Sequence, residues 1–554
     1  MTSIREELVY IVINKAYALI DYNIQNTIDK QFEFVKKIVL ADKSLTKNEK
    51  SFAINQLNKD SDSYKLLYNE GTKRICENCY DECLATLFCE HCVRNYLKSN
   101  FSNWTSGNND IDNLIRQCQM KTINLYRIVE WIPYNNLQNI NYLTKGGCSE
   151  IYTADWTDGH YVEWDSKEKQ LKRLGQSVIL KKLENVESAN RSWFEESKSH
   201  LSISNKYSQV AECYGLTKNP SNGNYMLVMS RYDINLREYL QQNHNKLKWK
   251  ERIQIINAII GALRQIHQNN VIHRDLHSGN ILFNQIVQLF KISDFGFCGP
   301  ADKPLNSIYG NLPYIAPEVI CGKRTTFASD IYSIGMLMWE ISSGQPPFVY
   351  KHNYDLALKI INGMRPRIIP GTPLKYKELM EQCWDADPTK RPDIYTLDKE
   401  ISSLYRKYLN NENDEQQTNN ITNIDNFQLN TNFSISSTNS INTFFRNSSS
   451  RVYYFKNLPE PRNATKEEQE AYHSIQFDFD LQDGMITVED ESNKRIYFNE
   501  GQNNLTVNPN PKKVKLENND KDEDETYNPN FHSSEKRDEL KVTDCKMDLN
   551  YLLN

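Results

Sequence analysis

A set of polar motifs between residues 273 and 318 constrains this chain more than any other feature. The stretch 271–282 reads VIHRDLHSGNIL, and it is followed by the triplet DFG at 294–296 and the triplet APE at 316–318. Each triplet alone occurs by chance in unrelated sequences. Their joint order and spacing restrict both the fold that the chain can adopt and the chemistry that it can carry.

In this order and spacing the motifs resemble the signature set of the eukaryotic protein kinases. The resemblance implies an α+β fold with two lobes, a β-rich N-lobe and a helical C-lobe. It also implies that ATP and Mg²⁺ are used, and that the substrates are proteins whose hydroxyl groups accept the γ-phosphate. On this basis we expect residues 137–405 to form a protein kinase domain, in an enzyme of intracellular signalling.

By this resemblance the loop motifs supply three catalytic groups. Asp275 accepts the proton of the attacking hydroxyl, and Asn280 and Asp294 hold Mg²⁺, an ion that prefers hard oxygen ligands. Phosphoryl transfer passes through a loose transition state, so the protein mainly positions the reactants and neutralises charge. Asp330 is expected to anchor the backbone of the catalytic loop.

A lysine and a glutamate complete the expected catalytic set. The segment VILK at 178–181 resembles the family's VAIK strand, which makes Lys181 the partner of the ATP phosphates. A helix-like stretch begins at 194, and a carboxylate on it must pair with this lysine. We choose Glu196 for that role, with Glu195 as the alternative. The residues before the strand, 154–176, are expected to form a long charged loop.

The stretch LTKGGCSEIY at 143–152 resembles the glycine-rich loop over ATP. Gly146 and Gly147 would let backbone N–H groups approach the phosphates closely. Thr144 and Ser149 stand where the family usually has its first and third glycines.

The stretch 225–232 (YMLVMSRY) resembles the strand and hinge that border the adenine pocket. Met229 takes the gatekeeper position, and Ser230 to Tyr232 offer backbone groups to the base. The side chains expected to sandwich the adenine ring are Leu143, Ile151 and Leu282.

The residues 294–318 are expected to form the activation segment. In the family, the arginine equivalent to Arg274 commonly binds a phosphorylated residue of this segment, and Ser307 and Tyr309 are the available acceptors. We expect their phosphorylation to order the segment. A structural ion pair between Arg391 and Glu318 is expected within the C-lobe.

Two positions bear on the acceptor. Serine/threonine kinases usually carry lysine where this chain has His277, and threonine where it has Asn311. Tyrosine-specific members usually carry other catalytic-loop variants than HSGN. We expect a tyrosine-kinase-like enzyme that favours serine and threonine, with tyrosine or dual specificity open.

Before the kinase motifs, two C-x2-C pairs are separated by nine residues. Four thiolates on two tight turns can enclose Zn²⁺ tetrahedrally, which leaves the ion no open position and favours a structural site. The expected ligands are Cys76, Cys79, Cys89 and Cys92. Cys83 and His91 are spare ligands, so another set of four stays open. The alternative is a small core of reduced cysteines.

The remaining segments divide by pattern and composition. Residues 1–70 show helical spacing of apolar residues and are expected to form a helical hairpin; 71–106 form the cysteine module and 107–136 a linker. Residues 406–554 are rich in Asn, Ser and Thr and are expected to be mostly disordered, with an ordered island at 452–498. Protein partners are expected through the N-terminal module and the tail.

Composition excludes several classes of protein. The 554 residues carry a net charge of −5, which gives no global electrostatic reason to bind nucleic acid. The longest apolar stretch, Ile331–Ile341, is shorter than the roughly 20 residues that span a bilayer, and no secretory signal is recognisable, so no membrane association is expected. We expect a cytoplasmic protein; the basic run 511–515 leaves a nuclear location open.

Residues 1–405 as a whole resemble an expanded fungal family of tyrosine-kinase-like proteins with an N-terminal cysteine-pair module. The supporting segments are the cysteine pairs, NF…WTSGN at 100–108 and EWIPY at 130–134. The competing functions are a pseudokinase scaffold, favoured by the altered glycine-rich loop, and a nucleic-acid binder built on the cysteine module.

Overall fold

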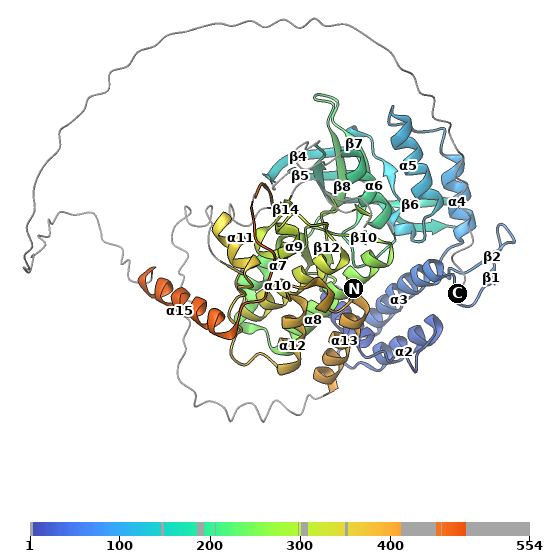
Figure 1. Ribbon diagram of the computed structural model, residues 1–554. Coiled ribbons are helices and arrows are strands. Elements are labelled where there is room, and N and C mark those ends of the chain that lie inside the picture. The colour runs from blue at the N-terminus through green and yellow to red at the C-terminus, as the bar shows by residue number, and fades with distance from the viewer. Residues whose placement is uncertain are drawn as a thin grey trace, which may run out of the picture. The chain divides into compact units, whose positions relative to one another are not determined.

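The computed structural model describes residues 4–145, 149–184, 193–204, 206–296, 299–300, 308–348, 353–410, 450–455 and 457–483 (Figure 1). All of them belong to the first of two units, Met1–Ile486. None of the described helices is long and apolar enough to cross a membrane.

The N-terminal segment contains the helices α1 (Glu6–Ala18), α2 (Ile28–Ala41) and α3 (Lys47–Tyr68), where a hairpin was expected. α3 begins with a capping box, in which Thr46 and Glu49 bond to each other's backbone N–H groups. Apolar residues of the three helices form their own core, which includes Val12, Val35 and Leu57. The side-chain amide of Asn14 donates to the carbonyl of Val287 in the kinase-like part, 3.0 Å away.

The cysteine module consists of the short strands β1 (Arg74–Ile75) and β2 (Glu82–Cys83) and the helix α4 (Glu90–Ser99). β1 and β2 pair antiparallel. Phe88, Val93 and Leu97 of the module pack in one cluster with Trp164 and Leu171. The module is therefore joined to the sheet described next.

The segment 107–136 is folded, so the prediction of a linker was wrong. It contains α5 (Asn109–Met120), the 3-10 turns η1 (Leu125–Arg127) and η2 (Tyr134–Asn136), and the strand β3 (Glu130–Trp131). Ile111 and Ile115 of α5 are fully buried in one cluster with Leu201 and Leu216. The segment completes the N-lobe core because its helix covers apolar surface that would otherwise face water.

The N-lobe sheet has the strand order β3-β7-β8-β6-β5-β4. Its further strands are β4 (Leu137–Lys145), β5 (Glu150–Asp165), β6 (Gln170–Lys182), β7 (Cys213–Lys218) and β8 (Tyr225–Ser230), and α6 (Trp193–Ser204) packs against β7. β3 adds to β7 in parallel, and the other neighbours are antiparallel.

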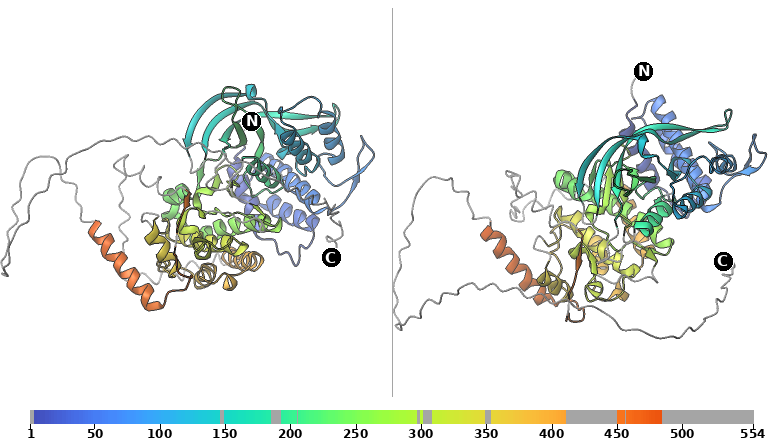
Figure 2. Two further views of the ribbon diagram at one scale, coloured as in Figure 1. Left: turned by 45° about the horizontal axis from the view of Figure 1, so that its top comes forward. Right: turned by 90° about the horizontal axis from the view of Figure 1, so that it is seen from above.

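The long charged loop expected at 154–176 is a hairpin, so that prediction was also wrong. β5 and β6 stay paired from Ile151 opposite Lys181 to Asp165 opposite Gln170, and the hairpin reaches the cysteine module (Figure 2). A register shift follows Trp156, near Gly159, whose φ is +68°. A Cβ at that glycine would lie 1.6 Å from the carbonyl oxygen of Leu174, so only glycine fits there.

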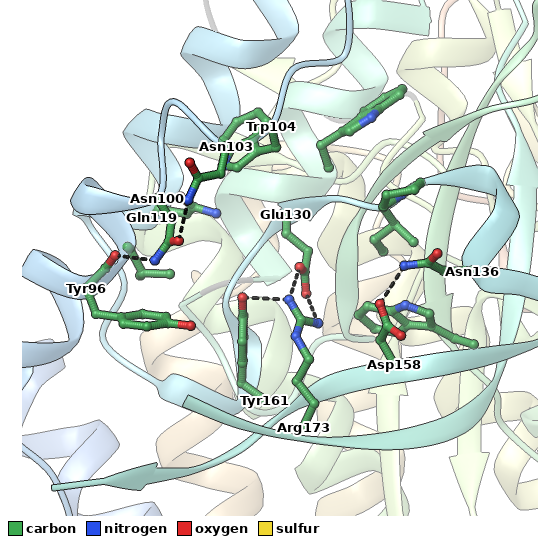
Figure 3. Close-up of a pocket in the computed structure, with 15 residues that line it drawn as sticks. Tyr96, Asn100, Asn103, Trp104, Gln119, Glu130, Asn136, Asp158, Tyr161 and Arg173 are labelled. Carbon is green, nitrogen blue, oxygen red and sulfur yellow. Dashed lines mark hydrogen bonds and ion pairs between the residues drawn. The ribbon is translucent and has the colours of Figure 1, made fainter. Parts of the chain in front are cut away.

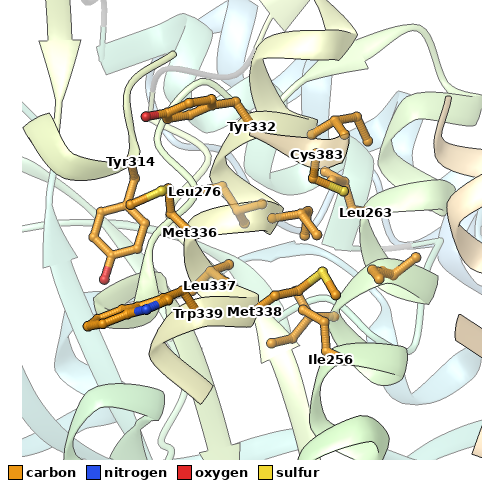
Figure 4. Packing of buried hydrophobic residues seen from close by; sticks show 14 of the residues in the cluster. Ile256, Leu263, Leu276, Tyr314, Tyr332, Met336, Leu337, Met338, Trp339 and Cys383 are labelled. Atoms are coloured by element: carbon orange, nitrogen blue, oxygen red, sulfur yellow. The ribbon is translucent and has the colours of Figure 1, made fainter. Parts of the chain in front are cut away.

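The C-lobe is built on α10 (Phe327–Ser343), of which Ser329–Ser342 are buried (Figure 4). Around it lie α7 (Leu236–Asn243), α8 (Trp249–Gln268), α9 (Pro317–Ile320), α11 (Tyr354–Ile361), α12 (Leu374–Cys383) and α13 (Ile394–Asn410). Figure 4 shows Ile256 and Leu263 of α8 facing Leu337 and Met338. This helical core supports the loops that carry residues of the candidate site.

Short strands border the two lobes. They are β9 (Ile234–Asn235), β10 (Val271–Ile272), β11 (Ile281–Asn284), β12 (Leu289–Ile292), β13 (Gly299–Pro300) and β14 (Ile308–Gly310). Within the tail, the structure describes β15 (Arg451–Tyr453) and α15 (Lys466–Asp483), which overlap the ordered island expected at 452–498. α13 runs past the expected boundary at 405.

Candidate active site

A buried ion pair joins the sheet to the helix beside it. Lys181 lies on β6, and its Nζ is 2.9 Å from Oε1 of Glu196 on α6 and 2.6 Å from Oδ1 of Asp294. The side chain of Glu196 is fully buried, whereas Glu195 is exposed. The structure thus brings together three of the five expected catalytic side chains, and Lys181 pairs with the glutamate that was our first choice.

Phe295, the residue after Asp294, fixes the direction of the Asp294 carboxylate. Phe295 is fully buried between the rings of His200 on α6 and His273, with ring centroids 5.3 and 5.5 Å away. Its backbone N–H donates to Nε2 of His200 over 3.3 Å. Asp294 itself has φ +59°, a left-handed conformation. The burial of Phe295 under α6 therefore directs the carboxylate of Asp294 toward Lys181.

Asp330 at the start of α10 fastens the catalytic loop. Its carboxylate accepts the backbone N–H groups of His273 and Arg274, at 2.8 and 2.9 Å, and contacts Nε2 of His267 at 2.9 Å. Burial opposes the charge of Asp330, but these hydrogen bonds and the neighbouring histidines hold its pKa below the ordinary value. The bonds also hold Arg274 at φ +69°, so the next residue is presented to the cleft.

That next residue is Asp275, which is 5% exposed. Asn280 donates from its side-chain amide to the backbone carbonyl of Asp275, 2.8 Å away, and accepts the N–H of Ser293 on its own carbonyl. Burial, together with the charge of Asp294, raises the pKa of Asp275 to about 7. A carboxylate whose pKa lies near the working pH is suited to accept a proton.

Only part of the expected phosphate loop is described. Gly146 and Gly147 lie outside the described residues. Leu143 on β4 is 53% exposed, and Ile151 on β5 stands opposite Lys181 in the strand ladder. Both residues lie on the two strands at one edge of the sheet, β4 and β5, where the resemblance places the base.

The expected hinge follows β8. Met229 is buried, and Leu282 of β11 packs against the same apolar cluster. The hydroxyl groups of Ser230 and Tyr214 are hydrogen bonded over 2.7 Å. The sheet and β11 thus contribute apolar side chains from both lobes to the expected adenine pocket.

A buried charge network that the motifs did not indicate holds this hinge. Glu212 accepts a hydrogen bond from the hydroxyl of Tyr232 and ion pairs with Arg127 and with Lys291. Burial alone would raise the pKa of Glu212, but the charges of Lys291 and Arg127 outweigh it and lower the pKa. Since the hydroxyl of Tyr232 points to Glu212, the expected contact of this residue with adenine is left to its backbone.

Comparison with known proteins identifies the kind of domain that contains this cleft. Residues 137–401 match the family model of the protein tyrosine and serine/threonine kinases. These residues form a protein kinase domain. Similar proteins include the dual specificity protein kinase zakA of Dictyostelium discoideum, 32% identical over 198 residues (32% of this chain, 25% of the relative), and a serine/threonine-protein kinase, STY17, of Arabidopsis thaliana, 28% identical over 283 residues (47% and 48%).

A dual serine/threonine and tyrosine protein kinase of Apis mellifera is 34% identical over 172 residues, 29% of this chain and 17% of the relative. The matches cover 17 to 48% of the length of these relatives. The likeness therefore concerns the kinase domain.

The C-lobe of the kinase domain contains the expected ion pair. Arg391 binds Glu318 with both ends of its guanidinium, at 2.8 and 2.7 Å, and the side chain of Arg391 is fully buried. Arg237 of α7 binds Glu340 of α10 in a second buried pair, which the motifs did not indicate. The bidentate pair of Arg391 with Glu318 fixes the geometry of the elements that it joins.

The cleft of the kinase domain also holds a residue from the tail. The hydroxyl of Ser450 donates to Oδ1 of Asp275 over 2.8 Å and lies 3.1 Å from Nε2 of His277. No motif marked this serine. Of the two acceptors expected in the activation segment, Tyr309 is 6% exposed and Ser307 lies outside the described residues.

The four expected zinc ligands are gathered in one place. The Sγ atoms of Cys76 and Cys92 are 3.7 Å apart, those of Cys79 and Cys89 are 3.6 Å apart, and all four lie within 4.8 Å of one another. A tetrahedral Zn²⁺ with bonds of about 2.3 Å requires sulfur atoms about 3.8 Å apart. None of the described cysteines forms a disulfide. The spacing of the thiols therefore fits the ion.

The spare ligands are placed differently. Cys83 groups with Cys89 and Glu90, not with the other three cysteines. Nε2 of His91 lies 3.1 Å from the backbone carbonyl of Glu82, so this ring already has a polar partner. The set of two C-x2-C pairs is the arrangement that the geometry favours.

A cavity of about 310 Å³ lies where the cysteine module meets the N-lobe (Figure 3). Its most prominent polar feature is Arg173, which pairs with Glu130 and donates to the hydroxyl of Tyr161 over 2.6 Å. The guanidinium also lies 3.9 Å from the centre of the Tyr161 ring. The polar groups of Arg173, Glu130 and Tyr161 bond to one another. We therefore interpret the cavity as incomplete packing between the cysteine module and the N-lobe.

Proposed function

We propose that the whole protein is an ATP-dependent protein kinase that transfers the γ-phosphate to serine or threonine hydroxyl groups of proteins. The observation that carries this function is the joint placement of the buried pair Lys181 and Glu196 with the partly exposed Asp294, while Asp275 is held on the neighbouring loop. A kinase that lacked activity would have no need to maintain a buried lysine between two carboxylates, because such a cluster is costly to desolvate.

Each residue of the candidate site has its own role in phosphate transfer. Lys181, oriented by Glu196, neutralises phosphate oxygens, and the backbone of the hinge binds the adenine. Asn280 and Asp294 would hold Mg²⁺, which supplies positive charge to the phosphate oxygens. Asp275 receives the proton of the acceptor hydroxyl as the new bond to phosphorus forms. Transfer thus depends mainly on position and charge.

The test is transfer of labelled γ-phosphate from ATP with MgCl₂ to casein, a general acceptor protein, by the purified full chain. We expect Asp275→Asn and Lys181→Met to lower the rate by about 10²-fold or more. Lys182→Met is the matched control for Lys181, because the side chain of Lys182 pairs with Glu150 and Glu184. Equal and negligible transfer by all of these proteins would favour the pseudokinase scaffold.

We further propose that the cysteine module holds a structural Zn²⁺ through Cys76, Cys79, Cys89 and Cys92. The distances between the Sγ atoms support this, and four thiolates leave the ion no open position for catalysis. Elemental analysis of the purified full chain should find about one zinc per chain, an amount that Cys79→Ser lowers. A zinc-free, fully folded protein would leave the reduced-cysteine core as the explanation.

The resemblance of residues 1–405 to the fungal tyrosine-kinase-like family supports the same arrangement of module and kinase domain. Protein partners of the N-terminal module and the tail, and a cytoplasmic or nuclear location, are further parts of this proposal. Relatives named as dual specificity kinases keep tyrosine as a second acceptor to be tested by phosphoamino-acid analysis of labelled casein.

A further inference from the structure

The tail segment 450–455 lies in the groove beside the catalytic loop. Its strand β15 pairs antiparallel with β14 of the activation segment (Figure 1). The register places Arg451 opposite Gly310, Val452 opposite Tyr309 and Tyr453 opposite Ile308. An extended segment that adds a strand in this way is bound largely through its backbone, a mode by which many peptides are recognised.

The pairing brings Ser450 to the base of the cleft, where its side chain is almost completely buried. Its hydroxyl donates to Asp275 over 2.8 Å. His277 contacts the same oxygen with Nε2 and accepts the N–H of Gly279 on Nδ1, at 3.1 Å in both cases. Because Nδ1 accepts this N–H, it carries no proton, and the proton of the ring is on Nε2.

These contacts orient the hydroxyl completely. His277 donates to the oxygen, and the hydroxyl proton points to the carboxylate of Asp275. A general base must lie within about 2.6–3.2 Å of the atom whose proton it receives, and 2.8 Å satisfies this. The remaining lone pair of the oxygen is available to attack phosphorus.

The residues after the strand dock on the C-lobe. Asn463 accepts the N–H of Ala386 and donates to Asp385, both over 2.9 Å. Gln469 donates to the carbonyl of Gly363 over 2.6 Å. We call residues 450–473, of which 456 is not described, the strap.

A close backbone approach shows that this docking is specific. Gly363 has φ +86°, and a Cβ there would lie 2.1 Å from the backbone N of Ala464. Only glycine lets the strap lie so close. Tyr453 and Tyr472 of the strap are both buried in the C-lobe core.

We propose that Ser450 is a phosphate acceptor of this chain's own kinase domain, with the strap bound in cis as the substrate segment. The inference rests on the proposed kinase function, and ATP is the phosphate donor. The bond from Oγ of Ser450 to the γ-phosphorus forms, while the bond from that phosphorus to the oxygen bridging to ADP breaks. The hydroxyl proton passes to Asp275, and ADP leaves with the electron pair of the broken bond.

Two consequences follow for other substrates. The groove accepts an extended segment with a serine beside Asp275 and three following residues along β14. Another protein must displace the strap in order to use the same groove. The product carries a phosphate dianion next to the carboxyl group of Asp275, so repulsion favours release of the strap after transfer.

The first experiment maps phosphate on the full chain. Phosphatase-treated protein is incubated with ATP and MgCl₂, and peptides are analysed by mass spectrometry. We expect phosphate on Ser450, absent in Ser450→Ala and retained in the matched control Ser449→Ala. The rate constant should not change on tenfold dilution, because transfer occurs within one chain. A rate constant that falls in proportion to dilution, or phosphate on Ser449 in place of Ser450, overturns the inference.

The second experiment weakens the strap away from the cleft. Asn463→Ala and Gln469→Ala remove hydrogen bonds to the C-lobe, and the double variant is expected to weaken docking about tenfold or more. Phosphate on Ser450 should then accumulate more slowly and casein be phosphorylated faster. A thermal melt confirms that the variants are folded.

The two proposals fail separately. Casein labelled without phosphate on Ser450 overturns the inference and leaves the kinase function standing. If faster casein labelling in the anchor variants accompanies an unmodified Ser450, the strap is a blocker and not a substrate. No label on casein or on Ser450, in the wild type and in the anchor variants, removes the kinase function and with it the inference.

Discussion

Arg127 and Glu212 form an ion pair of 2.5 Å that joins the segment before the kinase domain to the residues under its hinge. Arg127 also donates to the backbone carbonyl of Ser204, at the end of α6, over 2.9 Å. One buried guanidinium therefore contacts both the helix that carries Glu196 and the carboxylate that binds Tyr232. The N-lobe of this protein is incomplete without residues that precede its family match.

We expect Arg127→Ala to lower the free energy of unfolding by about 3 kcal/mol, because it leaves the buried Glu212 with fewer cationic partners. Lys172→Ala is the matched control, since Lys172 pairs with Asp165 at an exposed position. Urea unfolding followed by circular dichroism measures both. Equal midpoints for the wild type and Arg127→Ala would show that the pair does not contribute to stability.

The site was predictable from sequence because each motif is local and its chemistry needs particular residue types. The structure places Lys181, Glu196 and Asp294 together as the resemblance implied. Two folded segments were missed, and for one of them a signal existed in the sequence. In 109–120, Ile111, Ile115 and Cys118 have helical spacing after the capping residue Asn108, so a helix could have been predicted there.

The hairpin at 150–182 and the role of Ser450 were harder to predict. In the hairpin, Trp164 and Leu171 stand among polar and charged residues. The burial of these two side chains depends on the cysteine module, which comes much earlier in the chain. Ser450 stands in a polar tract, and its position depends on strand pairing with β14. Neither contact is visible in a local pattern, because the partner segments are distant in sequence.

Glu196→Gln should slow phosphate transfer to casein by about 10²-fold at saturating ATP, because Lys181 then loses one of the two charges that orient it. The neighbouring Glu195→Gln is the matched control, since Glu195 is exposed and should leave the rate unchanged. Initial rates of labelled phosphate transfer distinguish the two. A larger loss in Glu195→Gln would reassign the partner of Lys181.

The stability of the fold should depend on pH through Asp275. Burial and the charge of Asp294 raise its pKa to about 7 from an ordinary value of 3.8. Between these two values the folded state binds more protons than the unfolded state, so the contribution of Asp275 is present below pH 3.8 and lost as the pH rises through about 7. Asp275→Asn should therefore stabilise the protein more at pH 8 than at pH 4.

Differences in melting temperature between variant and wild type at the two pH values test this. Asp387→Asn is a control for a carboxyl that is charged in the folded state at both pH values, because hydrogen bonds from Thr389 lower the pKa of Asp387 from its ordinary value of 3.8. Its charged form is the stabilising one, and that contribution is lost only as the pH falls below about 3.8, so this substitution should change the melting temperature by a similar amount at pH 8 and at pH 4. A difference for Asp275→Asn that does not vary with pH would mean that this carboxyl titrates normally.

If the cysteine module holds Zn²⁺ as proposed, removal of the ion should destabilise the N-lobe side of the protein, because the module packs through Phe88, Val93 and Leu97 on Trp164 and Leu171 of the hairpin. Cys79→Ser should lower both the zinc content and the melting temperature, and a strong chelator should reproduce the loss in the wild type. Cys83→Ser is the matched control, since Cys83 lies in the same module outside the set of four, and it should retain zinc. If Cys83→Ser lost the metal and Cys79→Ser retained it, the ligand set would have to include Cys83 in place of Cys79. Transfer of phosphate to casein after chelation separates a structural ion from a catalytic one, because a structural ion affects the rate only through unfolding.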